Sequence, residues 1–418
     1  MTHATRIIVG VCVAFVAVAT VAPVLVFACP FCNAPSLTLT EQLAGADAAI
    51  LVKWIGGTPA NPTNTGTTEF EVEEVVHQHK SGQLEKGMKL NLIRYRLGKS
   101  GDLFLLLGTL GGEVLDWGSP LEVSRLGFEY MKLSPKPDQP AAQRLPYFLK
   151  YLEHSDRLIG DDAFGEFANA SYADVVLLAK DLPREKLRGW LTDKETSAGR
   201  LGLYGMMLGL CGTADDVTLM EHKILEVTED FRLGIAGVMG GYLLLTGETG
   251  LTVLEEQKLK DKKAPFSETY AAMQALRFMW QYGGNRISLE RLRQSMRILL
   301  DRPELADLVI ADLSRMKDWS QMDRLMTLYD DEAYNVPSIK RAVVRFLLAG
   351  TKDTGEKKDE NTKKAGAEPP LKEVPTATIG SATAVLPAHV GHALECLAAL
   401  EKKDPKTVNE AKRFFLLK

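Results

Sequence analysis

A ten-residue segment that recurs along the chain limits the possible folds more than any other feature. Residues 200–209 and 232–241 are identical at six of ten positions, at an offset of 32 residues. Weaker copies follow at 270–280, 305–316 and 338–350. A spacing of about 32 to 36 residues is typical of stacked helical pairs, in which each repeat buries its apolar face against its neighbours. The repeat therefore predicts an all-α solenoid over residues 141–350, built from about five or six helical pairs.

The last copy of the repeat carries a family resemblance. Residues 338–348 read Ser-Ile-Lys-Arg-Ala-Val-Val-Arg-Phe-Leu-Leu, an amphipathic helix that resembles the second helix of a HEAT repeat. The resemblance implies a HEAT-like α-solenoid. Because solenoids present extended surfaces, we expect the partner to be another protein or a polymer of the cell envelope.

Glycines recur inside the repeated helices, where each costs about 1 kcal/mol relative to alanine. Gly202, Gly205 and Gly209 are spaced three and four apart, as are Gly234, Gly237 and Gly241. This spacing places each set on one helix face. Two interpretations are open. The bare faces let neighbouring repeats approach closely, or they form a smooth groove that accepts a partner's backbone or helix.

The start of the chain, residues 1–28, predicts export. A short segment with Arg6 precedes an apolar run of 21 residues, 7–27, and small Ala28 follows. This is the order of a cleaved signal peptide, and cleavage after Ala28 leaves Cys29 first. Lipidation of Cys29 and an uncleaved anchor are the alternatives, since the run is long enough to span a bilayer. We expect a periplasmic or extracellular protein that meets a membrane only in those two cases.

Cys29-Pro30-Phe31-Cys32 is the motif with the most chemical content. Two thiols at this spacing can form a local disulfide, hold half of a metal site or exchange electrons. His77 and His79 lie two apart at the end of a predicted strand, so that together with Cys29 and Cys32 they form a candidate four-ligand zinc set. A structural disulfide that pins the amino-terminal segment is the simplest of these readings.

Residues 29–132 are mainly β in pattern. After a helix capped by Thr38 and Glu41, five short strands are predicted, near 48–55, 68–76, 88–93, 103–107 and 114–117. In the second strand Thr68, Phe70, Val72 and Val76 are expected to share one face. Short strands with Gly-rich turns predict a small five-stranded barrel of the OB type.

This β region resembles a netrin-like domain, the barrel that begins the tissue inhibitors of metalloproteinases. The shared features are Cys29, the Ala-Asp-Ala at 46–48, the strand at 70–76 followed by a Lys-Gly turn at 86–87, and the apolar strand at 102–107. The resemblance implies an inhibitor whose terminal cysteine chelates a protease zinc through its amine and carbonyl. The spacing here is Cys-x-x-Cys, whereas that family begins Cys-x-Cys.

The rest of the chain and its overall charge narrow the functional classes. Residues 351–384 are rich in Lys, Glu, Thr and Pro and predict a disordered charged linker. Residues 385–418 predict a helical pair that caps the solenoid. A net charge of only −4 gives no basis for binding nucleic acid.

The sequence thus predicts an α+β multidomain protein: a small OB-like barrel followed by an all-α solenoid. It contains no Gly-rich phosphate loop, no Gly-x-Ser-x-Gly elbow and no His-Glu-x-x-His motif. We therefore expect an exported, non-enzymatic binding or scaffold protein without a cofactor. The alternatives are a thiol-redox or metal-binding protein that acts through Cys29 and Cys32, and an extracellular metalloprotease inhibitor.

Overall fold

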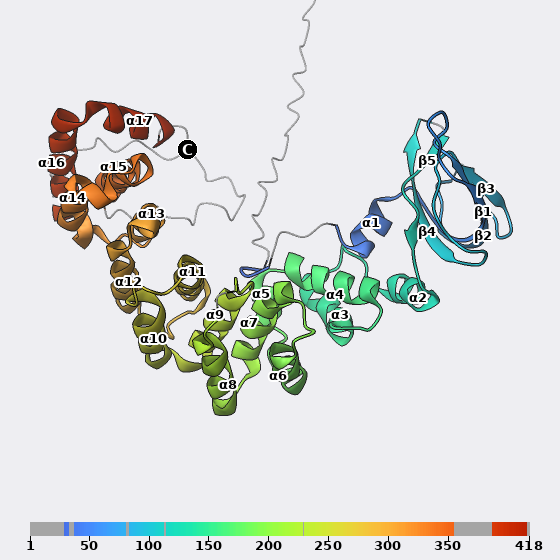
Figure 1. Ribbon diagram of the computed structural model, residues 1–418, viewed down its shortest axis with the longest axis horizontal. Coiled ribbons are helices and arrows are strands. Elements are labelled where there is room, and N and C mark those ends of the chain that lie inside the picture. The colour runs from blue at the N-terminus through green and yellow to red at the C-terminus, as the bar shows by residue number, and fades with distance from the viewer. Residues whose placement is uncertain are drawn as a thin grey trace, which may run out of the picture.

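The fold is mixed α+β, with a curled antiparallel sheet followed by helices that trace an arc (Figure 1). A computed structural model describes residues 29–32, 37–80, 83–112, 114–228, 230–354 and 387–415. The predicted signal and nearly all of the predicted linker lie outside these ranges. Within them, no helix combines the length and apolar character needed to cross a bilayer.

The sheet contains the five predicted strands and one more. Its elements are α1 (Leu39–Gly45), β1 (Ala48–Thr58), β2 (Thr67–His77), β3 (Lys89–Leu92), β4 (Leu103–Gly111), β5 (Val114–Trp117) and β6 (Leu121–Glu122). The order is β3-β2-β1-β4-β5, with β6 paired to β4, and every pairing is antiparallel. The predicted Thr38–Glu41 capping box is present at the start of α1.

The two faces of the sheet belong to two different cores. Alternate residues of the central strands, such as Ile50, Phe70 and Phe104, point to the inside of the curled sheet and are fully buried there. Leu51 and Leu105 point the other way and join the large apolar core of the helices. The sheet is therefore attached to the helical arc by the outer face of its central strands.

One prediction about the second strand is wrong, because the strand is bulged. The pairing register between β1 and β2 shifts between Leu51 and Val52, and again between Ala49 and Ile50. Each extra residue reverses the side on which the following side chains lie. As a result Val75, and not Val76, packs inside the curl, while Val76 contacts the helical core.

Sixteen further helices follow the sheet in the described part of the chain. They are α2 (Arg125–Leu133), α3 (Ala141–Phe148), α4 (Arg157–Asn169), α5 (Tyr172–Val176), α6 (Arg184–Thr192), α7 (Leu201–Cys211), α8 (Ala214–Leu225), α9 (Ile235–Thr246), α10 (Glu248–Leu254), α11 (Phe266–Tyr282), α12 (Leu289–Ile298), α13 (Ala306–Arg315), α14 (Met322–Asp330), α15 (Pro337–Lys352), α16 (Ala388–Lys403) and α17 (Pro405–Phe415). The first, α2, begins within the segment predicted to be barrel, because its buried residues pack into the helical core.

From α6 onward the helices come in pairs. Figure 1 shows α7, α9, α11, α13 and α15 on the inner side of the arc and α6, α8, α10, α12 and α14 on the outer side. The five repeated segments of the sequence fall on the five inner helices. The repeat therefore marks the second helix of each pair.

Buried carboxylates tie neighbouring pairs together through arginines. The ion pairs are Asp216 with Arg184 and Arg188, Glu268 with Arg232, Glu255 with Arg291, and Asp312 with Arg277. Burial raises the pKa of Asp216, but hydrogen bonds from Arg184 and from the Thr213 backbone outweigh it and hold that pKa below its usual value. Burial raises the pKa of Glu268 and of Glu255 as well, but hydrogen bonds from Arg232 and Arg291 help to hold both pKa values below their usual range. Each ion pair joins one helical pair to the next.

The last pair, α16 and α17, covers the end of the arc. Its residues Cys396, Leu400 and Ala411 belong to the same buried core as the preceding helices. At its edge the Tyr329 hydroxyl donates a hydrogen bond to Asp404 at 3.0 Å. Cys211, at the end of α7, and Cys396 are both free thiols.

Candidate functional site

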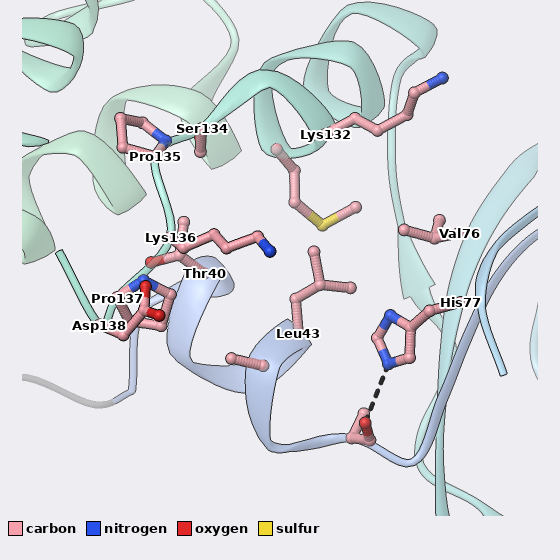
Figure 2. Close-up of a pocket in the computed structure, with 13 residues that line it drawn as sticks. Thr40, Leu43, Val76, His77, Lys132, Ser134, Pro135, Lys136, Pro137 and Asp138 are labelled. Carbon is pink, nitrogen blue, oxygen red and sulfur yellow. Dashed lines mark hydrogen bonds between the residues drawn. The ribbon is translucent and has the colours of Figure 1, made fainter. Parts of the chain in front are cut away.

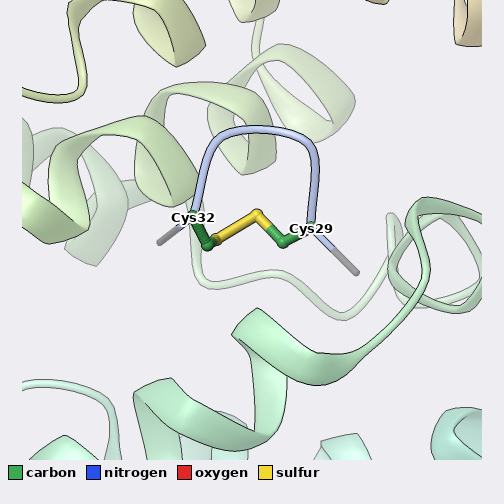
Figure 3. Close-up of a disulfide and its surroundings, with 2 residues drawn as sticks. All are labelled: Cys29 and Cys32. Atoms are coloured by element: carbon green, nitrogen blue, oxygen red, sulfur yellow. A yellow bond between two sulfur atoms is a disulfide. The ribbon is translucent and has the colours of Figure 1, made fainter. Parts of the chain in front are cut away.

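A four-residue turn closed by a disulfide lies on the inner side of the arc (Figures 1 and 3). Cys29 and Cys32 are bonded to each other, with their Cα atoms 5.3 Å apart. The backbone N–H of Cys29 donates to the Ala168 carbonyl at the end of α4, at 3.1 Å. Of the three uses predicted for this cysteine pair, the structure contains the local disulfide.

Phe31, at the tip of the turn, packs into a notch between three helices. Its ring centroid lies 4.8 Å from that of Phe278 on α11. A Cβ atom at Gly240 on α9 would lie 2.7 Å from Cζ of Phe31, and one at Gly202 on α7 would lie 2.9 Å from the Phe31 carbonyl oxygen. Such distances are too short for carbon atoms, so both glycines are needed for the turn to sit here.

The other repeat glycines bring α7 and α9 into backbone contact. A Cβ atom at Gly241 would lie 1.9 Å from the Gly205 carbonyl oxygen, and one at Gly209 would lie 2.4 Å from the Gly241 Cα atom. A Cβ atom at Gly237 would lie 2.1 Å from the Gly202 carbonyl oxygen. Close approach of neighbouring repeats therefore accounts for these three contacts. Gly202 and Gly240 in addition seat the chain's own Phe31, while a groove for a partner stays a prediction.

Gly234 also lies against α7, since a Cβ atom there would lie 2.7 Å from the Gly202 nitrogen, but it has a second, backbone requirement. It precedes α9 as the N-cap residue, with a left-handed backbone at φ +83°. Glycine adopts this conformation without the steric cost that a Cβ atom imposes. The first position of the second glycine set thus serves both the turn into α9 and the close approach to α7.

A cavity of about 250 Å³ opens beside the disulfide turn. Its walls are residues 30–32 of the turn, residues 231–237 before and within α9, and Ser267, Tyr270, Ala271 and Gln274 on α11. Cys32 is half-buried at this cavity, whereas Cys29 is 5% exposed. The only face of the disulfide that a solute could approach through this opening is therefore the Cys32 side.

The predicted zinc set is not brought together. His77 ends β2, where its Nε2 donates to the Ala46 carbonyl at 2.9 Å, and the two cysteine sulfurs are bonded to each other. Within the described ranges, no group of three or more His, Cys, Asp or Glu side chains is placed to hold a metal ion. The Cys29 N–H is engaged by the Ala168 carbonyl, and zinc chelation through a terminal Cys29 amine stays a prediction.

A second polar cluster fixes α1 against the helices. Asp162 accepts hydrogen bonds from the Leu39 N–H at 2.6 Å and from the Tyr130 hydroxyl at 2.8 Å. Its neighbour Glu166 is paired with Arg144 at 2.7 Å. Burial raises the pKa of Asp162 to about 6, despite the two donors. This cluster positions the sheet on the arc, and none of its groups opens into the cavity beside the disulfide.

Sequence reasoning missed the role of Phe31, although one signal was present. Gly240 stands at the position that Leu208 occupies in the first copy of the repeat. A glycine that replaces a core leucine in one copy alone indicates that something else fills the space. No family model, curated protein or solved structure matches this chain.

Proposed function

We propose that this chain is an exported, non-catalytic binding or scaffold protein that uses the inner face of an α-solenoid. The observation that carries the proposal is the alignment of α7, α9, α11, α13 and α15 in one row along the inner side of the arc (Figure 1). Repeats stacked in this way create an extended surface that suits a long partner. We regard the helical pairs as HEAT-like and the sheet as an open relative of the OB-type, netrin-like barrel.

The partner that fits this surface is a protein or a cell-envelope polymer. The inner row of helices extends over several helical pairs, and a small substrate would contact only a small part of this surface. The net charge of −4 supplies no attraction to nucleic acid. Next to the disulfide turn, Phe231 is 71% exposed and offers an apolar contact at the edge of this surface.

The disulfide also bears on how the protein is held in the envelope. A lipid anchor would require the Cys29 sulfur to form a thioether, yet this sulfur is bonded to Cys32. We therefore favour a protein that is not lipidated at Cys29. The mature protein would then be exported free of a lipid.

Photo-crosslinking from both sides of the arc tests the binding proposal. A benzoylphenylalanine is placed at Gln274 or Ser267, which line the inner cavity, and as a control at Thr218, exposed on outer helix α8. In intact cells we expect a discrete adduct from the inner positions and none from Thr218. Equal crosslinking from both sides, or none from either, would contradict the inner face as the binding surface.

Thiol–disulfide exchange is a second candidate, favoured by the exposure of Cys32 at the cavity. An incoming thiolate would attack the Cys32 sulfur and release Cys29 as a thiolate. Replacing both cysteines by serine separates the two functions. A scaffold keeps its crosslinked partner and loses some stability, whereas an exchange protein loses its activity completely.

A further inference from the structure

A cleft of about 650 Å³ lies where the sheet meets the helices, and it shares no lining residue with the cavity beside the disulfide (Figure 2). Three stretches far apart in sequence form it: residues 40–46 of α1 and its C-terminal end, residues 76–77 at the end of β2, and residues 131–138 from α2 onward. Its volume lies in the range of about 300 to 1,000 Å³ typical of ligand pockets, which often form at such junctions.

The floor of the cleft is apolar. Leu43 lies at its centre and Val76 on one side, as Figure 2 shows, and Met131 is a third apolar residue of the lining. Met131 is only 2% exposed because it also packs into the helical core, so it is a fixed part of the floor. Pro135 and Pro137 stiffen the opposite wall. A hydrocarbon chain laid on this floor would lose contact with water along one whole side.

The charged groups around the cleft have separate roles. Lys136 extends its ammonium over the floor, toward Leu43 (Figure 2). Lys132 points away from the cleft, and its ammonium is 2.6 Å from Glu74. The carboxylate of Asp138 lies beside Pro137 and does not reach the Lys136 ammonium (Figure 2). One positive charge therefore stands over an apolar surface.

His77 adds a polar group with a defined tautomer. Its Nε2 must carry a proton, because it donates to the Ala46 carbonyl. The other ring nitrogen, Nδ1, points toward the cleft (Figure 2). In the neutral ring Nδ1 accepts a hydrogen bond, and in the protonated ring it donates one. The cleft thus offers the Lys136 ammonium and the His77 Nδ1 atom above an apolar floor.

We propose that this cleft binds a medium-chain aliphatic monocarboxylate. The carboxylate pairs with the Lys136 ammonium, and the alkyl chain lies on Leu43, Val76 and Met131. A neutral chain would gain the apolar contacts but leave Lys136 without its anion, and a cationic head group would be repelled. This site is independent of the inner face and of the function proposed for it.

Calorimetric titration of the whole protein with a chain series tests the site. From hexanoate to octanoate to decanoate, each added methylene is expected to tighten binding about twofold, because full burial is worth about 0.8 kcal/mol per CH₂ and only one side of the chain is buried. Decan-1-ol should bind more weakly than decanoate, and decyltrimethylammonium should bind more weakly still. Affinity that does not depend on chain length, or a preference for the cationic head group, would overturn the proposal.

Two variants locate the binding. Lys136→Gln should weaken decanoate binding about three- to fivefold and leave decan-1-ol unchanged, since it removes one exposed ion pair. Lys150→Gln changes an exposed lysine outside the cleft and should alter neither. Ala44→Trp fills the cleft from its exposed rim and should abolish both. Decanoate binding that survives Ala44→Trp in a folded protein, or that ignores Lys136→Gln, would refute this site.

Discussion

Gly241→Ala tests whether backbone contact between α7 and α9 holds the repeats together. The new Cβ atom would lie 1.9 Å from the Gly205 carbonyl oxygen, whereas ordinary contacts begin at 3.4 Å. The two helices would have to separate by 1.5 Å, the difference between these distances. Overpacking of this kind costs about 1 to 3 kcal/mol, and a clash with backbone belongs at or above the upper end. Alanine returns about 1 kcal/mol as the better helix former. We expect a net loss of about 2 kcal/mol.

Gly189→Ala is the matched control, because Gly189 also lies inside a helix. It is exposed on α6, and a Cβ atom there would meet nothing within 4 Å. Because no clash arises, only the higher helix propensity of alanine over glycine counts, and this variant should be more stable than wild type by about 0.5 to 1 kcal/mol. The two substitutions are chemically identical and should have opposite signs.

Urea unfolding followed by circular dichroism measures both free energies of unfolding. Hydrogen exchange of the α7 and α9 amides shows whether the loss is local to this contact. If Gly241→Ala proves neutral or stabilising, as the control is expected to be, the glycines do not serve close packing and the reasoning fails.

Three further substitutions probe the disulfide, the ion pairs and the buried acid. Replacing Cys29 and Cys32 by serine opens a four-residue loop, which should cost about 2 kcal/mol by loop entropy and raise hydrogen exchange at the turn without unfolding the arc. Glu268→Gln leaves buried cations without a counter-charge and should cost about 3 to 5 kcal/mol in urea unfolding, whereas Glu256→Gln, at an exposed pair, should change stability by less than about 0.5 kcal/mol. Burial raises the pKa of Asp162 to about 6, so the folded protein binds the carboxyl proton more tightly than the unfolded chain does. The stability gained from this protonation is complete below the ordinary pKa of 3.8 and is lost as the pH rises through 6. The stability of wild type relative to Asp162→Asn should therefore fall over that window, and a flat difference would show that the carboxyl is not buried in solution.

Local patterns predicted the elements of this fold well. The 32-residue repeat marked the inner helices, and the capping box at Thr38 and Glu41 marked the start of α1, because both depend on residues close in the chain. The side of Val76 was missed because a bulge depends on the partner strand. The start of α2 at Arg125 was missed because tertiary packing, and not a strong local pattern, decides it.

The candidate site could be predicted only in pieces. The cysteine spacing predicted the disulfide, and the glycine spacing predicted close helix packing. Neither pattern indicates that Phe31 reaches α7, α9 and α11, since more than 160 residues separate it from the first of them. Contacts at such separation are set by how the whole arc curves, and no local sequence signal encodes that curvature.

The position of the disulfide turn limits where a partner can bind on the inner face. Leu208 is fully buried in the first copy of the repeat, and a leucine at the equivalent Gly240 would occupy the space of the Phe31 ring. A single difference between two copies thus makes room for the Phe31 ring at α9. With this turn in place, the chain covers its own inner face at α7 and α9. A partner bound there must either include residues 30–32 in its footprint or begin at α11, and loss of the turn should lengthen the bound segment toward the sheet.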